Sequence, residues 1–86
     1  MPPKSKWFVY IIEAENGHFY TGITTDLVRR FSQHQKKQGG ARFFHTSPAK
    51  QMVYHESHTD RSSASKREAA IKKLSRKAKT ELIALQ

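Results

Sequence analysis

The strongest constraint on the fold of this chain is an apolar run near its start, Trp-Phe-Val-Tyr-Ile-Ile at positions 7–12. Apolar side chains fall on both faces of such a segment, which is typical of a strand buried on both sides. We therefore expect a strand over 7–13, with helices covering both faces of its sheet. Asn16-Gly17 is a turn signal, because glycine accepts positive φ, and residues 18–24 are expected to form the returning strand.

The type of turn decides which side chains the two strands bring together. A two-residue turn at Asn16-Gly17 would put Tyr10 and Tyr20 on opposite faces. A three-residue loop over 15–17, with Gly17 in a left-handed bulge position, pairs Tyr10 with Gly22 and puts both tyrosines on one face. The other face then becomes almost wholly apolar, so we predict this register.

The middle of the chain predicts a helix and a connection. Residues 24–26, Thr-Thr-Asp, can supply an N-cap for a helix from about Asp26 to Gln38. The double glycine at 39–40 would end this helix. We expect a loop or a short helical turn over 41–50, which Pro48 closes.

The remaining residues predict a third strand and two more helices. We expect a strand over 51–57, in which Met52, Tyr54 and Glu56 share one face. Helices are expected over 61–74, capped by Thr59 or Asp60, and over 76–85, capped by Ser75. The expected fold class is α/β: a three-stranded antiparallel sheet flanked by helices, in the order β-β-α-β-α-α.

Length and composition limit the classes of protein. The 86 residues suit one domain over 7–86, after a short flexible lead-in over 1–6. No cysteine is present, which excludes disulfides, zinc fingers and thiol catalysis. The absence of cysteine is also compatible with a reducing compartment, and we expect a cytoplasmic location. No apolar run approaches the ~18 residues of a membrane span.

The formal net charge of +9 suggests a polyanionic partner, of which nucleic acid is the commonest. A solubilising lysine-rich surface and an acidic membrane or protein partner are the alternatives. Cleavage of a phosphodiester would need a base, a cation for the developing charge, and often a metal held by a carboxylate. The chain offers residues for each of these roles.

Two pairs of residues are candidates for the base and the cation. Tyr10 and Tyr20 share a strand face, although most strand tyrosines are core aromatics with hydroxyls at the rim. Arg30 and His34 lie four residues apart and so share one helix face, which could also be a solvated basic face. Arg29 points about 100° away and would contact backbone phosphate or solvent.

Glu68 is the candidate metal ligand. It falls in a stripe with Ala64, Ile71 and Leu74, and burying a lone carboxylate there is costly without a partner or a metal. A salt bridge to Lys72 is the alternative. His55 and His58 could be read as a metal pair, but with no cysteine and no further ligand at suitable spacing we do not expect zinc.

Taken together, these motifs resemble the GIY-YIG nuclease family. Val9-Tyr10-Ile11 stands where the family usually has Gly-Ile-Tyr, and Tyr20-Thr21-Gly22 stands where it usually has Tyr-Ile-Gly. The ten-residue separation, the Ile-Thr-Thr-Asp that follows and the Arg-Arg-Phe-x-x-His helix also fit. The resemblance covers about residues 6–80 and is closest to small stand-alone members.

The resemblance implies a metal-dependent endonuclease that hydrolyses DNA, with Mg²⁺ or Mn²⁺ as cofactor. Tyr10 would act as or orient the general base, Tyr20 would position water or phosphate, and Arg30 would stabilise the phosphate. His34 would lie near the attacking group, and Glu68 would bind the metal. Gly22 would keep side chains out of the site, and Gly17 would shape the turn.

DNA is the expected partner. The basic residues expected to contact it are Arg29, Lys36, Lys37, Arg42, His45, Lys66, Arg67, Lys72 and Lys73. The alternative function is a nucleic-acid-binding module with little or no catalysis. It is favoured because the family often has an asparagine where this chain reads Lys-Ala-Lys-Thr-Glu at 77–81, and because we expect no extra DNA-recognition domain. A protein–protein adaptor would need an exposed apolar patch, which the sequence does not single out.

Overall fold

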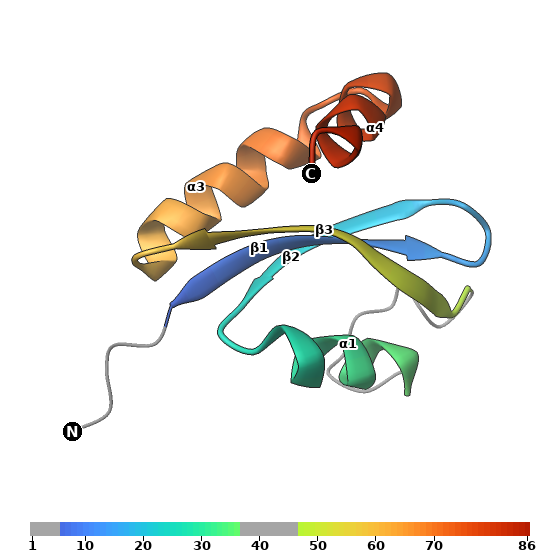
Figure 1. Ribbon diagram of the computed structural model, residues 1–86, viewed down its shortest axis with the longest axis horizontal. Helices are drawn as coiled ribbons and strands as arrows, with labels where there is room; N and C mark the ends of the chain where they lie inside the picture. The colour runs from blue at the N-terminus through green and yellow to red at the C-terminus, as the bar shows by residue number, and fades with distance from the viewer. Residues whose placement is uncertain (1–5, 37–46) are drawn as a thin grey trace.

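The computed structural model describes residues 6–36 and 47–86, in which a three-stranded antiparallel sheet lies between helices (Figure 1). The strands are β1 (Trp7–Ala14), β2 (Phe19–Thr24) and β3 (Ala49–His58), in the sheet order β2-β1-β3. The helices are α1 (Leu27–Gln35), α3 (Arg61–Lys72) and α4 (Arg76–Ala84). The predicted fold class and element order are confirmed. The expected lead-in, apart from residue 6, and most of the expected loop over 41–50 lie outside the described residues.

The hairpin of β1 and β2 has the predicted register. Gly17 adopts a φ of +86°, and its N–H donates to the carbonyl oxygen of Ala14 over 2.8 Å. Tyr10 lies opposite Gly22 in the ladder. Because side chains alternate along a strand, this pairing puts Tyr10 and Tyr20 on the same face of the sheet.

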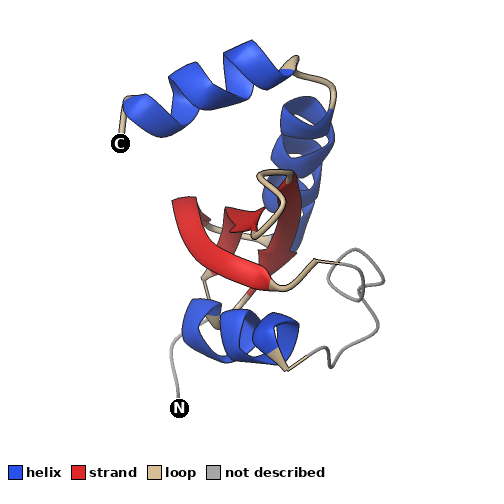
Figure 2. Cartoon of the chain, turned by 90° about the vertical axis from the view of Figure 1, so that its right-hand side faces the viewer, coloured by secondary structure: helices blue, strands red, loops and turns tan. Residues whose placement is uncertain are grey.

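Each face of the sheet packs against its own helices, as the doubly apolar β1 predicts (Figures 1 and 2). On one face, buried Tyr10 and Ile12 pack with Leu27 and Phe31 of α1. The opposite core contains Val9, Ile11, Ala64 and Ile71, with Leu82 and Ile83 of α4 packed against it. No helix among the described residues has the length and apolar character needed to cross a bilayer.

Strand β3 contains an irregularity that the sequence pattern did not reveal. The β1 residues at 11–12 lie opposite Tyr54 and Met52, which leaves Val53 as an extra residue in the ladder. Met52 packs with the Tyr10 side of the sheet, whereas Tyr54 packs with the other side. The prediction that Met52, Tyr54 and Glu56 share a face was therefore wrong, because strict alternation does not continue through a bulge.

The helices begin where their caps predict. Asp26, Asp60 and Ser75 each accept a hydrogen bond from the backbone N–H three residues later, over 3.0, 2.7 and 3.1 Å. The ends were predicted less well. Helix α1 ends at residue 35 rather than 38, α3 at 72 rather than 74, and α4 at 84 rather than 85, while β3 covers 49–58 rather than 51–57.

Candidate active site

Three aromatic rings from three elements meet between the sheet and α1. They belong to Tyr10 of β1, Tyr20 of β2 and His34 of α1, and we call them the aromatic cluster. The hydroxyl of Tyr10 lies 2.9 Å from Nε2 of His34, within hydrogen-bonding distance. The ring centroid of Tyr20 lies 6.3 Å from that of Tyr10 and 5.1 Å from that of His34. The cluster therefore brings together three of the five predicted catalytic residues.

Gly22 makes room for this arrangement. A Cβ atom added to Gly22 would lie 2.5 Å from the Tyr10 hydroxyl oxygen and 2.8 Å from Cζ of the same ring. Such contacts are far inside van der Waals distance, so any larger residue would displace the ring from His34. The hairpin register is what places this glycine opposite Tyr10.

Burial keeps both hydrogen-bonded groups neutral. Tyr10 is 1% exposed and His34 is 0% exposed. Desolvation raises the pKa of Tyr10 to about 12, in spite of the opposing hydrogen bond and charge of Arg30. Desolvation, together with the positive charge of Arg30, lowers the pKa of His34 to about 4. At neutral pH the pair is therefore a phenol and an uncharged imidazole.

Arg30 connects the aromatic cluster to an open groove. Its Nη1 donates to Oε1 of Gln33 over 3.0 Å, and its charge acts on both Tyr10 and His34. The groove has a volume of about 320 Å³. Its lining residues are Trp7, Ile23, Thr24, Thr25, Asp26, Arg29, Arg30 and Gln33. A phosphate in this groove would meet a guanidinium that is already held in place.

Glu68 approaches the cluster from the other layer of the fold. It lies on α3, its side chain is 23% exposed, and its charge contributes to raising the pKa of Tyr10. Lys72 Nζ lies 3.2 Å from its Oε2, so the salt bridge considered in the sequence is present. In the predicted stripe, Ala64 and Ile71 are buried, but Leu74 is 36% exposed and lies beyond the end of α3.

The donor set at Glu68 fits a weakly held hard cation. Within 6–36 and 47–86, no three histidine or acidic side chains come together as a metal site would require. A partly exposed carboxylate can contribute one oxygen ligand to Mg²⁺ or Mn²⁺, and such ions are commonly completed by water and substrate phosphate. The geometry is thus compatible with a metal that binds together with a phosphodiester.

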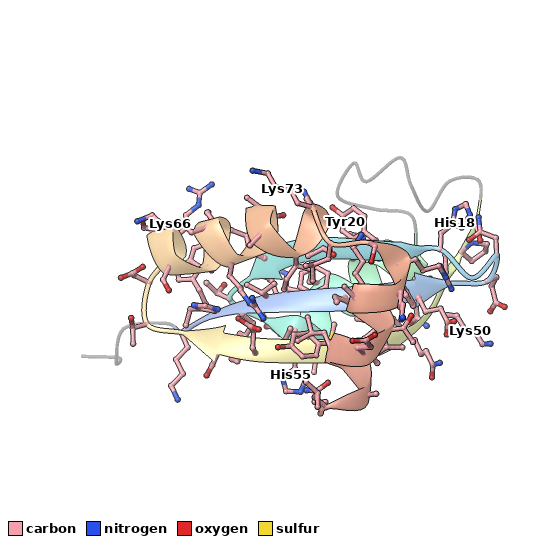
Figure 3. All side chains as sticks on the ribbon, turned by 90° about the horizontal axis from the view of Figure 1, so that it is seen from above. His18, Tyr20, Lys50, His55, Lys66 and Lys73 are labelled. Carbon is pink, nitrogen blue, oxygen red and sulfur yellow. The ribbon has the colours of Figure 1, made fainter. Side chains whose placement is uncertain are left out.

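Most of the predicted DNA-contacting residues within the described ranges are exposed. They are Arg29, Lys36, Lys66, Lys72 and Lys73. Lys66 lies on α3 and Lys73 directly after its last residue, and Figure 3 shows both at the surface of the molecule. Lys37, Arg42 and His45 lie outside the described residues. Arg67 is engaged within the protein, because its Nε bonds both carboxylate oxygens of Glu56 over 3.2 Å.

The sequence analysis did not identify a polar network between β3 and α3. The Glu56 carboxylate accepts from the Tyr54 hydroxyl and from Arg67, and lies 2.6 Å from Nε2 of His58. His58 Nδ1 in turn lies 2.7 Å from Oγ of Ser63. We call these five residues the Glu56 network. Its signal was the polar set at 54, 56 and 58, because alternate residues of a strand share a face.

Glu56 is held in its charged form. Burial alone would raise the pKa of its carboxyl, but the hydrogen bonds from Tyr54, His58 and Arg67 and the Arg67 charge outweigh it, so the pKa lies below its usual value. Burial also opposes the charge on Arg67, yet Glu56 and Tyr54 raise the pKa of Arg67 overall. The network therefore contains a partly buried ion pair, in which the Glu56 carboxylate has several hydrogen-bond partners.

Comparisons with known proteins agree with the geometry. The sequence model of the GIY-YIG catalytic domain matches residues 6–81. The chain is 49% identical over 77 residues to a UPF0213 protein of Pseudomonas aeruginosa, covering 90% of this chain and 73% of that protein. It is 47% identical to a UPF0213 protein of Desulfotalea psychrophila, covering 90% and 70%. A solution NMR structure of a UPF0213 protein from Bacillus halodurans matches with a TM-score of 0.60 and 32% identity, covering 94% of this chain and 85% of that one.

Proposed function

The chain belongs to the GIY-YIG family, and on that premise we propose that it is a metal-dependent endonuclease that hydrolyses phosphodiester bonds in DNA. The observation that carries the proposal is the hydrogen bond between buried Tyr10 and neutral His34, beside a groove lined by Arg30. This pair can move a proton without creating a free phenolate. We expect the activity to be cytoplasmic.

Tyr10 alone would be a poor base. With a pKa of about 12, only about one Tyr10 in 10⁵ would be ionised at pH 7. In a relay no free phenolate forms: Tyr10 accepts the proton of the attacking water while its own proton passes to Nε2 of His34, and the cost becomes the protonation of an imidazole whose pKa is about 4. The relay uses the His34 tautomer with its proton on Nδ1. A phosphate bound at Arg30 would offset one of the two causes that lower the pKa of His34.

The exposed surface of the site suggests where water enters. Tyr10 is 1% exposed, whereas Tyr20 and Arg30 are half-buried and lie nearer the surface. We place the attacking water at the rim formed by Tyr20 and Arg30, from which its proton passes inward to Tyr10. The new bond joins the water oxygen to phosphorus as the bond from phosphorus to the leaving oxygen breaks.

Arg30 and Glu68 supply the electrostatic part of the mechanism. The guanidinium of Arg30 would hold non-bridging phosphate oxygens and stabilise the charge that develops on them. Glu68 would hold Mg²⁺ or Mn²⁺, and a bound divalent ion would stabilise the leaving oxygen. The exposed basic residues Lys66 and Lys73 would contact the DNA backbone without reading its sequence.

The test is cleavage of plasmid DNA and of branched and flapped DNA with Mg²⁺ or Mn²⁺. Wild type is compared with Tyr10→Phe, Arg30→Ala and Glu68→Ala. Each variant is expected to lose about 10²-fold or more in rate, because each removes a group that acts on the transition state. Lys50→Ala, which removes an exposed cation from the start of β3, is the matched control for Arg30→Ala and should cleave like wild type (Figure 3). Undiminished cleavage by Arg30→Ala and Glu68→Ala would refute the assignment.

A second candidate function has a specific observation in its favour. Lys72 Nζ lies 3.2 Å from Oε2 of Glu68, so the ammonium would compete with a metal ion for this carboxylate. If Lys72 prevails, the protein is a nucleic-acid-binding module with little or no catalysis. Its binding would be sequence-independent and would weaken steeply with salt. Binding without cleavage in every divalent ion tried would favour this function over the nuclease.

A further inference from the structure

The Glu56 network joins strand β3 to helix α3. Glu56 lies on β3, which pairs with β1 on the side away from β2. Helix α3 packs against all three strands, so one helix connects the edge of β3 to the neighbourhood of β2. The aromatic cluster includes Tyr20 of β2, and Glu68 must reach it from α3. The rotation of α3 about its own axis therefore decides where Glu68 points.

Arg67 and Glu68 lie on opposite sides of the buried face of α3. Ala64 and Ile71 are fully buried against the sheet. Since successive helical residues are about 100° apart, Arg67 and Glu68 project about 50° to either side of the line through Ala64 and Ile71. Arg67 projects to the β3 side, where it meets Glu56. Glu68 consequently projects to the opposite side, that of β2, from which its charge acts on Tyr10.

The apolar contacts of α3, made by Ala64 and Ile71, define its rotation less sharply than directional bonds do. Ala64 is small, and apolar contacts are not directional. Directional bonds come from the Glu56 network, at two points one turn apart on the helix. Arg67 bonds both oxygens of Glu56, and Ser63 lies 2.7 Å from His58, which is itself 2.6 Å from Glu56.

We propose that Glu56 is a positioning residue that sets the rotation of α3 and so directs Glu68 toward the aromatic cluster. It acts through Arg67 and through the pair His58 and Ser63. The catalytic consequence rests on the proposed function; the mechanical link does not. A side-chain end about 5 Å from the helix axis moves by about 2 Å when the helix rotates by about 20°. Misplacement on this scale can cost about 10²-fold in rate.

The first experiment needs neither metal nor DNA. Amide NMR spectra of the metal-free protein are compared between wild type, Glu56→Gln and Glu81→Gln. The last removes the same charge from an exposed position on α4 and serves as the control. Glu56→Gln is expected to shift the amide signals of β2, Phe19–Thr24. The hydrogen bonds of the Glu56 network join residues of β3 and α3, so shifts in β2 would report a movement of α3. Shifts confined to β3 and the start of α3 would overturn the proposal.

The second experiment measures the consequence at Glu68. Titration with Mn²⁺ alone should broaden the Glu68 amide in wild type, and Glu56→Gln should need about tenfold more Mn²⁺ for the same broadening, as is typical when a residue supporting a ligand is changed. In cleavage assays kcat should fall about tenfold with KM for DNA within about twofold of wild type. Spectra and rates are taken at a temperature where unfolding curves show every variant to be folded.

The outcomes separate the two proposals. If wild type neither binds Mn²⁺ nor cleaves DNA, the proposed function fails, and the metal-free spectra alone decide whether Glu56 positions α3. If wild type binds and cleaves but Glu56→Gln matches it in Mn²⁺ broadening, kcat and β2 shifts, the positioning role is wrong. Ser63→Ala should shift the same β2 signals by less, and Ser62→Ala, its exposed neighbour on α3, should not shift them.

Discussion

Burial has opposite outcomes in the aromatic cluster, which is fully buried, and in the Glu56 network, which is partly buried. In the aromatic cluster desolvation prevails, raising the pKa of Tyr10 to about 12 and lowering that of His34 to about 4, so both groups stay neutral. In the Glu56 network hydrogen bonds and an ion pair prevail, and Glu56 stays charged despite burial. A neutral hydrogen-bonded pair can pass a proton. A charged and fully bonded pair resists any change of protonation and is suited to holding two elements together.

The largest expected effect concerns two arginines: removing Arg30 should mainly lower the cleavage rate, and removing Arg67 should mainly lower the free energy of unfolding. Arg30→Ala should lower the cleavage rate by about 10²–10³-fold, as the loss of a transition-state donor does, while lowering the free energy of unfolding by less than about 1 kcal/mol, because its partners Gln33 and Tyr10 are neutral. Arg67→Ala should lower the free energy of unfolding by about 1–2 kcal/mol, because it leaves the Glu56 charge without its ion-pair partner. Urea unfolding and cleavage assays measure both. Equal losses of stability in the two variants would break the comparison.

The second prediction is that the aromatic cluster and the Glu56 network affect stability over different ranges of pH. Between pH 6.5 and about 4, the unfolded chain binds a proton on His34 that the folded protein does not, so stability falls as pH falls through this range. The full effect is about 3 kcal/mol. Glu56, whose pKa is lowered from 4.5, gives stability that is present above this unfolded pKa and is lost as pH falls below it through the folded pKa.

The part of this range above about pH 5 therefore reports on His34 rather than on Glu56. Urea unfolding at a series of pH values should show the slope in wild type and a reduced slope in His34→Gln. The ring signals of His34 in NMR should titrate with a midpoint near 4. A midpoint near 6.5 would mean that burial does not keep this imidazole neutral.

Close packing of the aromatic cluster predicts the third effect. Gly22→Ala should cost about 1–3 kcal/mol of stability and break the hydrogen bond of Tyr10 to His34, because the new methyl group overlaps the Tyr10 ring. Gly17→Ala is the matched control: nothing lies within 4 Å of its added Cβ, so only the positive φ is penalised, by about 1 kcal/mol. Urea unfolding gives the costs, and the His34 ring signals in NMR should move in Gly22→Ala alone.

The smallest effect is expected from the outer end of the Glu56 network. Ser63→Ala removes the hydroxyl that lies 2.7 Å from His58, and should lower the free energy of unfolding by about 1 kcal/mol. Ser62→Ala removes an exposed hydroxyl from the adjacent residue and should change stability by less than about 0.5 kcal/mol. Indistinguishable unfolding curves would show that the hydroxyl of Ser63 adds nothing to the network.

Local sequence determined the hairpin and most of the aromatic cluster. The apolar run at 7–12 predicted a doubly buried strand, and Gly17 predicted the turn that puts Tyr10 and Tyr20 on one face. The four-residue spacing predicted that Arg30 and His34 share a face of α1. These features follow from strand and helix periodicity, which neighbouring residues set by themselves.

Tertiary structure alone decided the electrostatics and the long-range partners. Packing of α1 on the sheet buries His34 and lowers its pKa, and packing of α3 pairs Arg67 with Glu56 rather than leaving it for DNA. The extra residue Val53 changes which face Tyr54 occupies. The physical reason is the same in each case: desolvation and ion pairing depend on which elements pack together, and no local period specifies that. The early hairpin was therefore predictable residue by residue, whereas the position of Glu68 depends on how α3 docks.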